Sequence, residues 1–304
     1  MNIEDLKVIL KVAEFRSITK AAEQLDMSTA TASAALKRVE NLLGTELFIR
    51  TTRQLKLSSA GERYIPECEQ ALQVLDSAKQ NIKEDMGIID GEIRLAVSSD
   101  LGRNLVMPWL DEFMDDYKNL SVKINISDSN IDFYRDSVDM ALRYGTPNDA
   151  SMYGFKICDI PSCLCASPGY LKQYGTPKTL DELTHHNGLF YQLDGIKHDL
   201  WTFDENGKAC KVKMKGNRVS NDGDLVRQWC VAGKGLALKS SLDISSDLLS
   251  EKVIALKEFT PISKELWLVL PSRQSITPAV RLLRDMLKEK TSQIYKKMLT
   301  KGVI

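Results

Sequence analysis

Residues 17–44 constrain the fold of this chain more than any other stretch. Their sequence, SITKAAEQLDMSTATASAALKRVENLLG, predicts two helices separated by a polar turn at residues 26–28. Ser28 stands where the second helix needs an N-cap, and Gly44 stands where that helix should end. Four apolar residues of the second helix recur at helical spacing and form one narrow stripe: Ala32, Leu36, Val39 and Leu43. The spacing predicts a helix-turn-helix.

The opposite face of the second helix suits a DNA major groove. Small and hydroxyl-bearing residues come first, and cations follow them. Methyl groups suit thymine, hydroxyls suit base edges, and cations suit phosphates. The residues predicted to contact DNA from this helix are Ser28, Thr29, Ala30, Thr31, Ser33, Ala34 and Lys37. An ordinary helical hairpin is the alternative, because short motifs of this kind also match by chance.

The flanking segments favour DNA binding. Residues 3–15 predict a supporting helix, and residues 45–57 predict two short strands around a polar tip, the pattern of a wing. Arg50, Arg53 and Lys56 are placed there to meet phosphates or the minor groove. A solvated hairpin is the alternative interpretation, because exposed arginines are common.

The composition limits how DNA could be bound and where the protein works. The 41 basic and 41 acidic residues cancel, so affinity for DNA must come from a local patch. Because the sequence shows neither a basic-then-apolar leader nor an apolar run of about 18 residues, we expect neither secretion nor a membrane span. The 6 cysteines form no CxxC pair, which favours a reducing cytoplasm.

Residues 59–86 predict a long helix for pairing two chains. Ser59 and Glu62 have the spacing of a capping box at its start. Pro66 lies inside the helix and removes one backbone hydrogen bond. The predicted dimerisation residues follow a heptad pattern: Tyr64, Cys68, Ala71, Leu75, Ala78 and Ile82. The alternative is that this seam packs against the chain's own C-terminal body.

The rest of the chain predicts an α/β body with mostly parallel sheets. Helical patterns at 101–117, 132–137, 224–232 and 278–298 separate short apolar runs. The runs predicted as strands are 93–97, 122–126, 140–142, 164–166, 236–238 and 266–270.

Over essentially its whole length, the chain resembles the LysR-type transcriptional regulators. The residues that carry the resemblance are Ala21, Ala22, Leu25, Ser28, Ser33, Leu36, Glu40, Leu43, Gly44, Leu47, Phe48, Arg50, Ala60 and Gly61. The chain departs from the family where Gln-Pro usually follows Ser28, since it has Thr29-Ala30 there. It also has Ala34-Ala35 where the family usually carries cations or Gln. Fewer bidentate donors imply more reliance on methyl contacts and DNA shape.

The resemblance implies a multidomain protein. The expected parts are an all-α winged helix-turn-helix domain at 1–58, a dimerisation linker helix and hinge at 59–90, and a periplasmic-binding-protein-like effector domain at 91–304, an α/β body of two lobes. Lobe I would hold about 92–161 and 267–304, and lobe II about 162–266. The implied partners are promoter DNA in double-stranded form, a small-molecule effector, further copies of the chain as a dimer or tetramer, and RNA polymerase.

Polar residues at predicted strand ends mark a candidate effector site. Ser98 and Ser99 follow a strand and precede a helix, and Arg143 ends another strand. Such positions collect ligands in open α/β sheets and favour an anion, so a carboxylate is the candidate ligand group. Asn221 and Asp222 precede a further helix, and the resemblance places all five residues at the cleft. Helix caps and a surface salt bridge are the alternative.

No catalytic constellation, metal site or cofactor motif stands out, so we expect no enzyme activity and no cofactor. Two other functions stay open. One is a solute-binding protein or small-molecule enzyme with a helical appendage. The other is a regulator switched by oxidation of Cys158, Cys163 and Cys165.

Overall fold

The computed structural model describes residues 2–50, 55–131, 133, 136, 138–147 and 152–304, with the backbone alone at Arg50. The chain forms two units. The first is mainly residues up to Ile88 and also takes in segments around 132–137 and 273–277, and the second contains the remainder. Among the described residues, no helix has the length and apolar character needed to span a bilayer.

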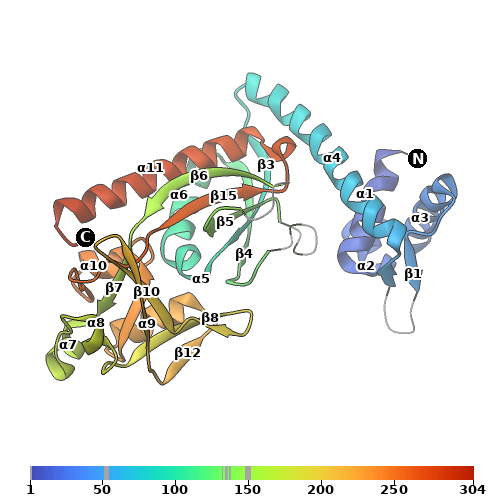
Figure 1. Ribbon diagram of the computed structural model, residues 1–304. Coiled ribbons are helices and arrows are strands. Elements are labelled where there is room, and N and C mark those ends of the chain that lie inside the picture. The colour runs from blue at the N-terminus through green and yellow to red at the C-terminus, as the bar shows by residue number, and fades with distance from the viewer. Residues whose placement is uncertain (1, 51–54, 132, 134–135, 137, 148–151) are drawn as a thin grey trace. The chain divides into compact units, whose positions relative to one another are not determined.

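The first unit is mostly helical (Figure 1). Its elements are α1 (Ile3–Phe15), α2 (Ile18–Gln24), α3 (Thr29–Leu43), β1 (Phe48–Arg50), β2 (Leu55–Leu57), α4 (Ser59–Asp85) and the 3-10 turn η2 (Arg273–Ser275). The predicted helix-turn-helix is therefore confirmed as α2 and α3, with Ser28 as N-cap and a left-handed Gly44 as C-cap. The predicted strand pair is confirmed as well, because β1 and β2 pair antiparallel with Phe48 opposite Leu57.

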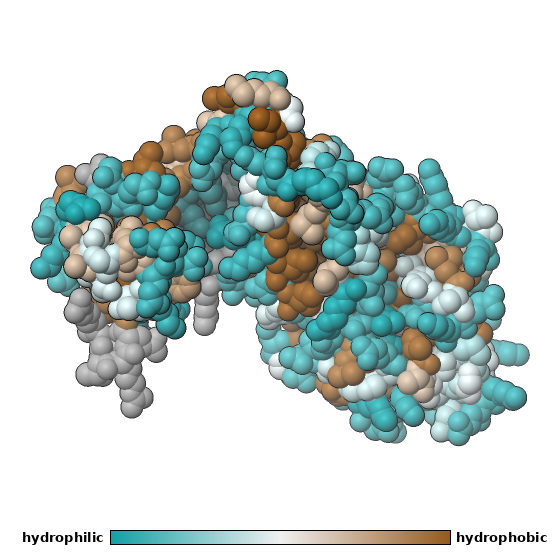
Figure 2. Space-filling model, turned by 180° about the vertical axis from the view of Figure 1, so that it is seen from behind, coloured by the Kyte–Doolittle hydropathy of each residue, from teal (hydrophilic) through white to brown (hydrophobic). Residues whose placement is uncertain are grey.

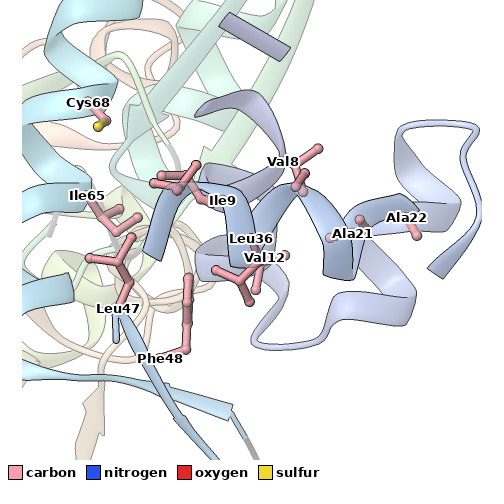
Figure 3. Close-up of a cluster of buried hydrophobic side chains, with 13 residues drawn as sticks. Val8, Ile9, Val12, Ala21, Ala22, Leu36, Leu47, Phe48, Ile65 and Cys68 are labelled. Atoms are coloured by element: carbon pink, nitrogen blue, oxygen red, sulfur yellow. The ribbon is translucent and has the colours of Figure 1, made fainter. Parts of the chain in front are cut away.

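One apolar core holds this unit together (Figure 3). Ala32, Leu36 and Val39 of the predicted stripe are buried there, against Ile9 of α1. A salt bridge of 2.5 Å between Arg38 Nη2 and Asp5 Oδ1 ties α3 to α1. The carboxyl of Asp5 therefore has a lowered pKa, mainly because Arg38 donates to it.

Helix α4 begins at Ser59 as predicted, but its capping residue differs from the prediction. Ser58, and not Ser59, is the N-cap: its backbone is extended, and its Oγ accepts a hydrogen bond from the Gly61 amide at 3.0 Å. The hydroxyl of Ser58 also donates to Glu46 O at 2.6 Å. This second bond fixes Ser58 at the junction of the wing and α4. Because Ser58 and not Ser59 is the N-cap, the predicted capping box of Ser59 and Glu62 is wrong.

The second unit is built from two lobes (Figure 1). The first lobe contains β3 (Asp90–Val97), α5 (Ser99–Leu101), the π-helical turn η1 (Gly102–Val106), α6 (Met107–Asp116), β4 (Asn119–Ile126), β5 (Met140–Tyr144), β6 (Tyr153–Ile160), β15 (Lys264–Leu270) and α11 (Pro278–Thr300). The second lobe contains β7 (Ser162–Ala166), α7 (Pro168–Tyr174), α8 (Leu180–Leu183), β8 (Gly188–Leu193), β9 (Ile196–Lys197), β10 (Leu200–Glu205), β11 (Lys208–Lys213), β12 (Arg218–Ser220), α9 (Gly223–Val231), β13 (Leu236–Ser240), α10 (Ser245–Leu249) and β14 (Ile254–Ala255).

Each lobe has a mixed sheet, so the expectation of mostly parallel sheets is wrong. The first sheet has the order β4-β3-β5-β15-β6, and only the pairs of β3 are parallel. The second has the order β12-β8-β13-β7-β14, with antiparallel pairs from β13 onward. The chain passes from the first lobe to the second at Pro161 and returns to the first in β15. The strands next to these two crossings pair antiparallel with their neighbours. Lys264, Glu265 and Leu266, predicted in lobe II, belong to β15.

Candidate functional site

The polar face of α3 is open to solvent. Ser28, Thr29, Ala30, Thr31, Ala34 and Lys37 are exposed, and Ser33 is half-buried. Ser28 Oγ accepts from the Thr31 amide at 3.1 Å and lies 2.8 Å from the Thr31 hydroxyl. The helix therefore presents methyls, hydroxyls and one ammonium group on a single rigid face.

The wing is fastened to α3 by Glu40. Its Oε1 accepts hydrogen bonds from the Leu47 amide at 2.8 Å and the Phe48 amide at 3.3 Å. The predicted wing contact Arg53 lies outside the described residues, and of Arg50 the structure describes only the backbone in β1. Sequence reasoning gave Glu40 no role, although a carboxylate one turn before a helix end, followed by a strand, is a signal for such an anchor.

The heptad residues of α4 divide into two groups. Tyr64 and Cys68 pack with the core of the first unit, and Cys68 is 6% exposed. Since Cys68 is covered by its own chain, its assignment to a dimer interface is wrong. The remaining residues form an exposed seam: Ala71, Leu75, Ala78 and Ile82. Figure 2 shows patches of hydrophobic surface, in brown, within a mostly hydrophilic exterior on this face.

The second unit contains a cavity of about 720 Å³. Elements of both lobes line it, with polar side chains predominating: Ser99, Arg103, Ile126, Ser127, Asp128, Ser129, Tyr191, Gln192, Leu193, Asp194, Gly195, Val219, Ser220, Asn221 and Asp222. Of the five predicted effector residues, Ser99, Asn221 and Asp222 line this cavity, whereas Ser98 and Arg143 do not.

Those two predicted residues lie behind the cavity wall. Arg143 Nη1 donates to the Ser127 carbonyl at 2.6 Å and so supports the loop after β4. Ser98 Oγ is buried and has no hydrogen-bond partner among the described residues.

Asp222 caps α9 by accepting from Leu225 N at 3.0 Å, and its other oxygen accepts from Arg103 at 2.7 Å.

The position predicted for an effector carboxylate is occupied by Asp128, which sequence reasoning missed. Asp128 Oδ1 accepts from the Ser99 amide at 2.7 Å. Its Oδ2 accepts from the Ser99 hydroxyl at 2.5 Å and from the Gly223 amide at 2.8 Å. Ser99 belongs to the first lobe and Gly223 to the second, so one carboxylate joins both lobes.

Behind the cavity, charged side chains from both lobes form a buried network. The Lys239 ammonium pairs with Asp100 and also donates to the Gly223 carbonyl at 3.0 Å. Burial alone would lower the pKa of Lys239, but the carboxylates of Asp100 and Asp243 outweigh burial and raise it. Arg227 lies 2.7 Å from both Asp224 and Asp247. Paired charges of this kind hold two packed surfaces in a fixed alignment, because separating the two partners would leave an unpaired charge buried.

The cysteines fit core packing. Cys165 Sγ lies 3.8 Å from Cys230 Sγ, and both residues are buried. Burial also raises the pKa of Cys158 to about 11, which keeps it in the unreactive thiol form. Across the part of the chain that the structure describes, no group of three or more His, Cys, Asp or Glu side chains could hold a metal ion.

Comparisons with known proteins cover both units. The family model "Bacterial regulatory helix-turn-helix protein, lysR family" matches residues 3–62, and "LysR substrate binding domain" matches residues 88–292. An HTH-type transcriptional regulator of Haemophilus influenzae is 30% identical over 276 residues, which are 90% of this chain and 96% of that protein. The HTH-type transcriptional regulator CrgA of Neisseria meningitidis serogroup C is 30% identical over 255 residues, 84% and 85% of the two chains.

A solved structure matches almost end to end. It is that of CrgA, described as a LysR-type transcriptional regulator from Neisseria meningitidis. Its TM-score is 0.59 at 26% identity, and the match covers 97% of this chain and 99% of that one.

Proposed function

The chain belongs to the family of LysR-type transcriptional regulators, and from that premise we propose that the exposed face of α3 reads operator DNA while the cavity of the effector-binding domain receives the controlling small molecule. The protein is a DNA-binding regulator of transcription and not an enzyme. One alternative was a solute-binding protein or small-molecule enzyme with a helical appendage. That helical segment is a DNA-binding domain.

The exposure of the polar side of α3 supports the DNA-reading assignment most strongly. The apolar side is buried against α1, so the exposed side is the one available to a major groove. We assign Ala30 and Ala34 to methyl contacts, Thr29, Thr31 and Ser33 to base edges, and Lys37 to phosphate. Arg38 is excluded from this set, because its guanidinium is engaged by Asp5.

Two copies would present two such helices to a palindromic site. The exposed seam of α4 supports pairing, since four apolar residues in heptad register lie uncovered in one chain. We further propose assembly of dimers into a tetramer, a contact with RNA polymerase at the promoter, and action in the cytoplasm, where the target DNA lies. Oxidation as the switch is disfavoured, because Cys163 and Cys165 are buried and Cys158 is a weakly acidic thiol.

Operator binding by a Lys37→Ala variant tests the α3 assignment. Operator fragments are first selected from the genome of the source organism with the full chain. If Lys37 contacts a phosphate, the variant binds all selected operators more weakly, and the slope of log affinity against log salt falls by about 0.9 per protomer.

Lys172→Ala is the matched control, because Lys172 is an exposed lysine on α7. This variant should bind as the unaltered protein does. An unchanged salt slope in Lys37→Ala would contradict the α3 assignment.

A further inference from the structure

The carboxylate of Asp128 has the hydrogen bonds that a bound ligand carboxylate would have. Its two oxygens accept from the Ser99 amide, the Ser99 hydroxyl and the Gly223 amide, at 2.7, 2.5 and 2.8 Å. We call these three donors the carboxylate site. Ser99 is 3% exposed, and its hydroxyl, which donates to Asp128, also accepts from the Asp224 amide at 3.2 Å.

The backbone of Asp128 is held from the second lobe as well. The Tyr191 hydroxyl, on β8, donates to the Asp128 carbonyl at 3.1 Å. The preceding residue, Ser127, is fixed by Arg143 and by its own amide, which donates to the Val97 carbonyl at 3.0 Å. The loop is therefore positioned on both sides of Asp128, and the side chain is held in the carboxylate site.

Gly223 allows this close approach. A Cβ at position 223 would lie 3.1 Å from Asp100 Oδ2 and 3.5 Å from Asp128 Oδ2. A side chain there would press on both carboxylates that meet the start of α9. Because Gly223 has no side chain, its backbone amide can donate to Asp128.

We propose that Asp128 is a specificity-determining residue: its carboxylate replaces a ligand carboxylate between the lobes and excludes carboxylate effectors from that position. The inference rests on the proposed function of the cavity as effector site and corrects the expectation of an anionic ligand at Ser99. The lobes are joined there by a carboxylate of the chain itself.

The charges around the cavity agree with this exclusion. Besides Asp128, the lining contains Asp194 and Asp222 and a single cation, Arg103, which pairs with Asp222 at 2.7 Å. Asp194 accepts a hydrogen bond from the uncharged Asn130 side chain at 2.8 Å, so three carboxylates and one guanidinium line the cavity. An anionic group entering beside Asp128 would meet like charge, whereas a cationic or uncharged polar group would not. The effector class is therefore a cationic or neutral polar molecule.

Replacing Asp128 by Ala and adding formate tests the proposal on the full chain. Alanine keeps Cβ, and formate supplies the missing carboxylate, so the two together rebuild the aspartate in the carboxylate site. We expect Asp128→Ala to melt at a lower temperature than the unaltered protein. About 0.1 M formate should then raise its melting temperature by about 3–5 °C more than equal sodium chloride does, in a saturable way.

Asp128→Asn is the matched control. Asparagine fills the carboxylate site without a charge, so this variant and the unaltered protein should show the same melting temperature in formate and in chloride. Absence of a formate-specific rise in Asp128→Ala, or an equal rise in the unaltered protein, would overturn the proposal. If Asp128→Ala does not fold unaided, its recovery on refolding in formate against chloride is the measurement: recovery in formate alone supports the proposal, and none overturns it.

These readouts are independent of DNA. A loss of operator binding in Lys37→Ala concerns the α3 assignment and leaves the melting result unaffected. Formate could raise the melting temperature of Asp128→Ala while the cavity binds no cationic or neutral effector. That result would support the carboxylate site and reject the cavity as the effector site.

Discussion

At the scale of single residues, Gly61 decides how closely α4 approaches the wing. A Cβ at this position would lie 2.2 Å from the Leu47 carbonyl oxygen, which is backbone and cannot rotate away. The same carbonyl accepts from the Ser58 amide at 2.9 Å. Glycine is therefore required by the junction between β1 and α4.

Gly61→Ala should destabilise the first unit by about 1–3 kcal/mol, because the junction must shift to admit the methyl group. Since all 4 tryptophans lie at or beyond residue 109, fluorescence would miss the change. Amide hydrogen exchange in residues 2–50 and 55–88 is the suitable measurement. Gly169→Ala is the control, because a Cβ there meets nothing within 4 Å; equal protection in the two variants would contradict the prediction.

Asp243 is a buried carboxyl group with a strongly raised pKa. Burial and the nearby Asp100 raise its pKa to about 7, although Lys239 and the hydrogen bond from Tyr144 oppose the rise. Lys264 is a further cation that favours its charged form, and Tyr295 of α11 also feels its charge. The folded chain therefore binds a proton at Asp243 that the unfolded chain has already lost above its ordinary pKa of 3.8.

The free energy of unfolding of the second unit should fall as pH rises from about 4 to 8 through this group, because the folded state binds more protons than the unfolded state in that range. The Asp243→Asn variant lacks this titration. Urea unfolding followed by tryptophan fluorescence at several pH values gives the difference between the two proteins. That difference should grow in favour of the variant toward pH 8, and a constant difference would reject the assignment.

At the scale of elements, α4 carries two different apolar surfaces on one helix. Ile65 and Cys68 complete the core of the first unit (Figure 3), while the seam of Leu75 and Ile82 is 51% and 59% exposed. A third side is engaged differently, since Ser77 Oγ donates to the Gln274 carbonyl at 3.0 Å. The exposed seam is the surface that we propose pairs with a second chain.

Leu75→Glu should weaken self-association at least about tenfold, because pairing would bury an unpaired carboxylate from each chain in the apolar seam. Sedimentation equilibrium over a range of concentrations measures the change. Leu75→Met keeps the volume and apolar character and should associate as the unaltered protein does. A dimer unaffected by the glutamate would place the interface elsewhere.

Periodicity predicted the long elements well and the short ones poorly. Helices α1, α3 and α4 follow from their apolar spacing, because 13 to 27 residues give a repeat enough positions to be recognised. Strands β10 and β11 were missed, since they form a two-stranded sheet with charged outer faces, such as Lys211 and Lys213. Each of these strands is stabilised by pairing with the other, and the local sequence pattern does not indicate that stability.

At the scale of the whole molecule, what sequence could not reveal depends on contacts between distant residues. Ser99 was recognisable as a polar strand end, but Asp128 lies 29 positions away and Gly223 lies 95 positions beyond that. Only the folded lobes bring a carboxylate to those donors. The buried pair of Lys239 and Asp100, 139 positions apart, was unpredictable for the same reason.

The anchor of the wing has a further consequence for how DNA sites are spaced. Glu40 belongs to α3, and its carboxylate accepts from the amide of Leu47 and from that of Phe48, the first residue of β1. In the DNA-reading mode that we propose, α3 and β1 would therefore turn together, and the number of base pairs between their contacts would be set by geometry inside a single chain. Any adaptation to operators of different length would then fall to the joints between copies.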